Sequence, residues 1–202
     1  MRFAGLTTAL VGFAWLASRR FAPIAGADVF YSVAMLAASL SALAERRTAV
    51  RAWNAVGAST VLAAAAVIAT GMDGLADAAV YLSGTIPAWI AGTFALRRLV
   101  STETRSLNWY HGLATDRPWA SMAFFFSALA LSGFPISPAF LGEDLLLHHA
   151  IGHHRWLAAA ITLSFVVNGI ALVRLYVRLC LGPRELRTHG TEAESIRARK
   201  VG

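Results

Sequence analysis

The sequence predicts an all-α integral membrane protein with about six transmembrane helices, one of them broken. The chain is 57% hydrophobic and 14% charged over 202 residues, whereas a soluble domain carries about 25% charge. Its apolar residues gather in six segments, and short clusters of arginine separate most of them. Within the segment 118–150, a glycine and two prolines interrupt the helical pattern, which predicts a discontinuous helix.

Each apolar segment is interpreted as one crossing of the bilayer, which takes a helix of about 20 residues, with about 17 as a lower limit. The first segment is marginal in length and follows Arg2 as a signal peptide would, but 16–20 is a poor cleavage site, so we expect a helix. Residues 1–182 are therefore predicted to form one transmembrane domain, and 183–202 a basic tail. The segments are 3–18, 21–44, 53–71, 75–96, 118–150 and 156–182.

Arginine positions predict the orientation, because loops on the cytoplasmic side are enriched in basic residues. With the N-terminus inside, the outer side carries only Arg19, Arg20 and Arg155. We therefore expect a multi-pass protein of the inner (plasma) membrane with both termini in the cytoplasm. The basic residues lie between apolar runs rather than along one face, so lipid is the expected surrounding and nucleic acid is not an expected partner. The inner side collects Arg2, Arg46, Arg47, Arg51, Arg97, Arg98, Arg105, Arg117, Arg178 and the tail.

The helix break is predicted from Gly133, Pro135 and Pro138. Ser137 is expected to cap a second half-helix that has Pro138 at its first position, where the missing N–H does no harm. The positive end of that half-helix would lie near mid-membrane and stabilise a nearby anion. Broken helices and intramembrane carboxylates are both costly, so their combination indicates an ion or proton site.

Glu143 falls in the second turn of the expected half-helix. It could hold a proton, or it could form an ion pair with an arginine of a neighbouring helix such as Arg174. Asp144 lies about 100° further round the helix, on the face of His148. That pair could relay protons outward, or it could be a solvated interfacial pair.

The other polar residues of the apolar segments are interpreted mainly as interfacial or structural side chains. Asp28 and Asp77 are expected near the outer interface, and Asn168 indicates a polar contact between helices. The cluster of histidines at 148–154 could form a metal site or a pH-sensitive proton exit, or its members could be plain interfacial side chains. We expect no metal, because no further ligand set accompanies them. Cys180 is the single cysteine, which excludes an internal disulfide, and no cofactor fingerprint or catalytic triad is present. The histidines of this cluster are His148, His149, His153 and His154.

Several runs of the chain resemble one family of membrane proteins. The runs are Arg117-Pro118-Trp119, 129–135 (Leu-Ala-Leu-Ser-Gly-Phe-Pro) and 140–143 (Phe-Leu-Gly-Glu), with further likeness at Gly112-Leu113, 174–182 and 42–57. They are similar to the discontinuous helix and its flanks in antiporter-like subunits, which are the proton-pumping subunits of respiratory complex I and their relatives in Mrp-type antiporters and membrane hydrogenases. The resemblance is specific over 107–182 and implies the second of the two inverted repeats of such subunits.

The resemblance also implies buried lysines and a histidine in the helix that matches 75–96. The single lysine of this chain is Lys200, and 75–96 offers Tyr81, Ser83, Thr85 and Pro87 instead. Glu143 alone is carried over, at a position where the family places a carboxylate or lysine. The resemblance therefore implies a subunit of a larger proton- or cation-translocating complex, with Glu143 in a pathway shared with other membrane subunits. The alternative is a non-conducting structural or assembly subunit, and in neither case do we expect the chain to catalyse a reaction alone.

Overall fold

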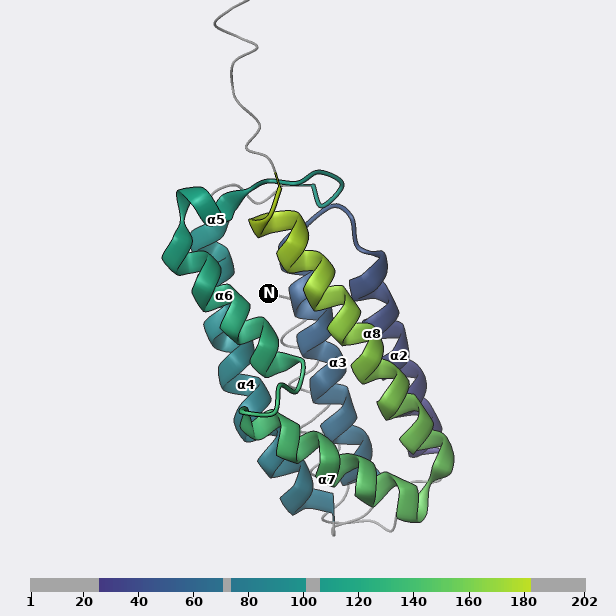
Figure 1. Ribbon diagram of the computed structural model, residues 1–202. Coiled ribbons are helices and arrows are strands. Elements are labelled where there is room, and N and C mark those ends of the chain that lie inside the picture. The colour runs from purple at the N-terminus through teal and green to yellow at the C-terminus, as the bar shows by residue number, and fades with distance from the viewer. Residues whose placement is uncertain (1–25, 71–73, 101–105, 183–202) are drawn as a thin grey trace, which may run out of the picture.

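The computed structural model describes residues 26–70, 74–100 and 106–182 (Figure 1). Within these ranges all regular structure is helical, which confirms the predicted all-α class. Among the described residues, four helices are long and apolar enough to cross a membrane: α2, α3, α4 and α8. The expected first segment 3–18 and the tail 183–202 lie outside the described residues. The helices are α2 (Ala27–Ala44), α3 (Ala49–Thr70), α4 (Gly74–Leu99), α5 (Leu113–Asp116), α6 (Pro118–Leu131), α7 (Pro138–His153) and α8 (Arg155–Cys180).

The segment 118–150 forms two helices, α6 and α7, as the predicted break requires. In Figure 1, α6 runs beside α4, whereas α7 leans obliquely across the bundle from α4 toward the start of α8. Together α6 and α7 make a fifth crossing of the bundle. Between them, the six residues 132–137 have no helical backbone and lie beside the long helices.

Helix α3 lies at the centre of the bundle and contacts α2, α4, α7 and α8. Its consecutive residues 63–67 are completely buried, and four of those five are alanine. Small side chains let helix backbones approach closely, which is the main source of helix association inside a membrane. The low bulk of α3 therefore allows four helices to pack around one.

Two tryptophans interlock α3 with α4, each one lying on a glycine of the other helix. A Cβ atom added to Gly92 would lie 2.1 Å from the Trp53 ring, and one added to Gly57 would lie 2.4 Å from the Trp89 ring. The indole nitrogen of Trp53 also donates to the Thr93 hydroxyl at 3.0 Å. The two glycines are therefore required by space, not by backbone conformation.

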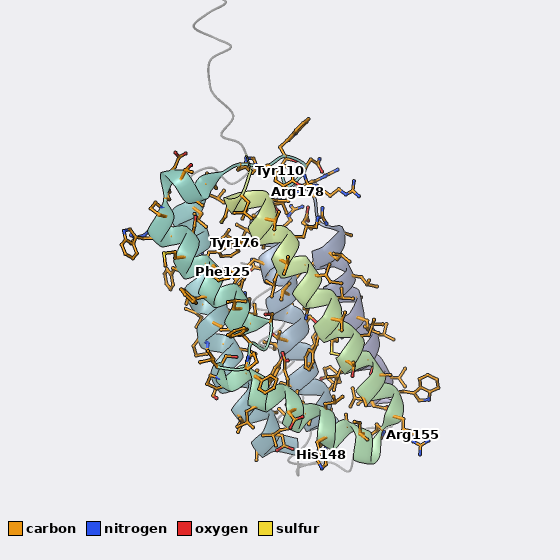
Figure 2. All side chains as sticks on the ribbon, viewed as in Figure 1. Tyr110, Phe125, His148, Arg155, Tyr176 and Arg178 are labelled. Carbon is orange, nitrogen blue, oxygen red and sulfur yellow. The ribbon has the colours of Figure 1, made fainter. Side chains whose placement is uncertain are left out.

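The described arginines gather at one end of the bundle, and Arg155 alone lies at the other. At the arginine-rich end the loop before α5 is tied to its surroundings: the amide of Leu107 donates to the Arg46 carbonyl (2.8 Å) and the amide of His111 to the Arg178 carbonyl (3.0 Å). Figure 2 shows Tyr110 and Arg178 at this end and His148 and Arg155 at the opposite one. The bundle thus has the charge asymmetry on which the predicted orientation depends.

Candidate functional site

The break is built from two local signals. Helix α6 ends in a Schellman motif, in which the amide of Phe134 donates to the Leu129 carbonyl (3.0 Å) and that of Gly133 to the Ala130 carbonyl (3.4 Å). Gly133 occupies the left-handed position of this motif, with φ of +70°, where glycine carries no steric penalty. Helix α7 then starts at Pro138 in its first position, as predicted.

Ser137 is the N-cap residue of α7, but the expected side-chain cap is not formed. Its hydroxyl donates instead to the Phe134 carbonyl at 2.8 Å, so it closes the turn that precedes the helix. The carbonyl of Ser137 accepts from the amide of Phe140 at 3.1 Å. Because the side chain does not bond to the first amides of α7, the positive end of that helix keeps its unneutralised partial charge.

The carboxylate of Glu143 folds back over the break. A Cβ atom added to Gly133 would lie 2.0 Å from its Oε2 atom and 2.6 Å from its Oε1 atom. The side chain is partly buried, and it lies on a turn of α7 that packs against α4. Gly133 is therefore constrained twice, by its backbone conformation and by the carboxylate that occupies the place of a side chain.

Tyr81 of α4 lies next to Glu143, a proximity that sequence reasoning missed. The phenol is completely buried, interacts electrostatically with Glu143, and its hydroxyl has no hydrogen-bond partner among the described residues. Two glycines bring α4 and α7 this close: a Cβ added to Gly142 would lie 2.2 Å from Tyr81 Cα, and one added to Gly84 would lie 2.3 Å from the Ala139 nitrogen. The glycines at 84 and 142 are the sequence signal that could have indicated this contact.

Asp144 and His148 lie on a different face of α7 from Glu143. Both side chains are exposed, and within the described ranges neither makes a hydrogen bond or ion pair. The structure therefore places them on one row, one turn apart, but it does not join them to each other or to Glu143.

Two other histidines form pairs with carboxylates at the same end. His149 Nδ1 lies 3.7 Å from Asp77 Oδ2 of α4, and His154 Nδ1 lies 3.3 Å from Asp28 Oδ2 of α2. These pairs tie the end of α7 and the start of α8 to two long helices. Across the described residues, no group of three or more histidine, cysteine or acidic side chains gathers in a way that could hold a metal ion.

Arg174 does not meet Glu143. Its guanidinium donates to the Leu43 carbonyl at the end of α2, and it lines a small gap together with Glu45 and Arg178 near the arginine-rich end. The structure thus separates the two groups of the suggested ion pair, and Arg174 instead satisfies one of the free carbonyls that end α2.

A second polar cluster lies in the core between α2, α3 and α8. The hydroxyls of Ser39, Ser59 and Ser164 are mutually within hydrogen-bonding distance, at 2.7, 2.7 and 2.8 Å, and all three residues are completely buried. Asn168 donates from Nδ2 to the Ser59 hydroxyl at 3.1 Å, which confirms the predicted polar contact between helices. Ser59 is therefore the hub of a hydrogen-bonded clamp on three helices.

Replacing this hub should weaken the bundle measurably. We expect Ser59→Ala to lower the free energy of unfolding by about 1–2 kcal/mol, because it removes bonds to three side chains and leaves the Asn168 amide unpaired. The measurement is denaturant unfolding of the purified protein in detergent. Ser83→Ala is the matched control, since the Ser83 hydroxyl is exposed and donates only to the Val80 carbonyl of its own helix. Equal effects of the two substitutions would contradict the clamp.

One comparison with known proteins places these features together. The family model described as the transmembrane region of NADH:quinone oxidoreductase and Mrp antiporter proteins matches residues 29–168. The match runs from the start of α2 to the middle of α8. It includes Tyr81, the break and Glu143, as well as the serine clamp up to Asn168.

Proposed function

The chain belongs to the NADH:quinone oxidoreductase/Mrp antiporter membrane family, and from that membership we propose that it is a proton-handling subunit of a larger membrane complex. Glu143 is the group proposed to take up and release the proton. The observation that carries the proposal is the position of its carboxylate over the break of an interrupted crossing, where it interacts electrostatically with the buried Tyr81. Intramembrane ionisable groups at such interruptions are typical of proton and ion pathways.

The surroundings of Glu143 allow it to exist in two protonation states. The uncapped positive end of α7 favours the carboxylate, whereas the apolar packing of α4 against α7 favours the neutral acid. The buried Tyr81 phenol interacts electrostatically with Glu143, and its hydroxyl is a donor without a partner among the described residues. Glu143 is therefore suited to exchange a proton rather than to hold a fixed charge.

Asp144 and His148 remain candidates for the outward side of the pathway. They continue along α7 from the turn of Glu143 to the end that carries Arg155, and both are exposed. The chain has no lysine in any membrane segment, so we propose that other membrane subunits supply the rest of the route. We further propose the inner (plasma) membrane as its location, with the arginine-rich end facing the cytoplasm.

The test is Glu143→Gln in the native complex. We expect proton translocation by membrane vesicles to fall at least about tenfold, as for the loss of a proton-transfer group, while the amount of assembled complex is unchanged. Glu45→Gln is the matched control, because Glu45 caps backbone amides of Arg47 (2.6 Å) and Thr48 (3.4 Å), a role that glutamine retains. Normal translocation by an intact Glu143→Gln complex would overturn the proposal and leave a non-conducting structural subunit as the alternative.

A further inference from the structure

The outer face of α7 carries a stripe with the spacing of a helix-packing seam. Its members are Leu141, Asp144, His148 and Ile151, at successive separations of three, four and three residues. All four are exposed, and the two apolar members are 57% and 59% accessible. Spacings of three and four keep residues on one side of a helix, and this is the pattern by which two helices pack along each other.

The polar members of the stripe argue against lipid as its covering. Asp144 lies nine residues before the last residue of α7, His153, about 13 Å along the axis of a helix that leans obliquely across the bundle. A carboxylate that faces hydrocarbon is costly unless a cation or a hydrogen-bond donor meets it. The apolar members on both sides of the polar pair extend the same face, so the stripe as a whole fits a protein surface.

Three other carboxylates of the described ranges have such compensation inside the chain. Asp28 and Asp77 pair with histidines, and Glu45 accepts backbone amides. Glu143 accepts no hydrogen bond within the described ranges, but it is partly buried and folds over the break rather than facing outward. Asp144 is exposed and has no such contact within the part of the chain that the structure describes, so a basic group of a neighbouring helix would supply what this part does not.

We propose that the stripe of Leu141, Asp144, His148 and Ile151 is the docking surface for a transmembrane helix of another subunit, which carries an arginine or lysine opposite Asp144. The inference rests on the proposed function only in taking the chain to be one subunit of a complex. The apolar members provide the packing, and the single acidic position fixes the register and selects a basic partner. His148 adds a second hydrogen-bonding group one turn away.

A designed peptide tests this in a defined system. The purified chain is reconstituted in phosphatidylcholine vesicles with a labelled leucine–alanine transmembrane peptide that carries one central arginine, and energy transfer reports association. We expect the arginine peptide to bind about three- to tenfold more tightly than its all-apolar counterpart, the scale of polar contacts between membrane helices. Asp144→Asn should remove this preference, whereas Glu143→Gln, one residue away on an inward face, should retain it.

A charge exchange keeps the test decisive if Asp144→Asn folds poorly. Asp144→Arg should reject the arginine peptide and bind one that carries a central glutamate. Equal binding of the arginine and apolar peptides to the native chain would overturn the proposal, as would association of the chain with itself that depends on Asp144. These outcomes are independent of proton translocation, so they separate a failure of the docking surface from a failure of the pathway through Glu143.

Discussion

Gly133→Ala is expected to destabilise the protein by about 2–3 kcal/mol and to reduce proton translocation to the level of Glu143→Gln. An alanine at φ of +70° costs about 1–2 kcal/mol, because its Cβ crowds the neighbouring carbonyl. The same Cβ would lie 2.0 Å from Glu143 Oε2, so the carboxylate has to leave its place over the break. Stability and the position of the Glu143 carboxylate are thus coupled through one residue.

A double-mutant cycle separates the two effects. In a Glu143→Ala background the clash is absent, so Gly133→Ala should cost only the backbone term of about 1–2 kcal/mol. Unfolding of the four proteins in detergent gives the coupling free energy between positions 133 and 143. A coupling of zero would show that the carboxylate does not lie against Gly133 and would contradict the geometry of the site.

Gly142→Ala should have the larger effect on folding, about 3 kcal/mol. Its Cβ would lie 2.2 Å from the Cα and 2.6 Å from the nitrogen of Tyr81, and backbone atoms cannot move aside as a flexible side chain can. The substitution therefore has to separate α7 from α4, which also moves Tyr81 away from Glu143. Thermal unfolding in detergent measures the loss of stability.

Gly169→Ala is the matched control for this prediction. Gly169 also lies within a helix, α8, but no atom lies within 4 Å of the position of an added Cβ. The higher helix propensity of alanine should leave the protein unchanged or stabilise it by up to about 1 kcal/mol. If Gly142→Ala were equally mild, the close approach of α4 and α7 would be wrong.

The break could be predicted from sequence because its causes are local. Gly133 at a left-handed position and Pro138 at a first helical position act on their own backbone, whatever packs around them. The end of α6 at Leu131 and the start of α7 at Pro138 follow from these two residues. The hydroxyl of Ser137 was predicted wrongly, because a serine can also donate to a preceding carbonyl, and the turn between the helices offered one.

The partners of the site could not be predicted, because they depend on how distant helices pack. Tyr81 meets Glu143 only through the approach of α4 to α7, and His154 finds Asp28 on a helix far away in the sequence. The residue type and depth of Asn168 predicted a contact between helices. They did not predict that the Ser59 hydroxyl would accept the hydrogen bond from its amide. The carbonyl acceptor of Arg174, at Leu43 on α2, could not be predicted for the same reason.

The attachment of α7 has a consequence for how a proton would move. Helix α7 is fixed near its start, where Gly84 of α4 meets Ala139 and Gly142 meets Tyr81 of α4, and near its end by the pair of His149 with Asp77 of α4. A helix held to one neighbour at both ends moves with that neighbour as a rigid body. The proposed proton exchange at Glu143 would then rely on rotation of its side chain rather than on the microsecond to millisecond swing of a hinged half-helix. In that case the backbone of the interruption would stay in place while the Glu143 carboxyl group changes its rotamer.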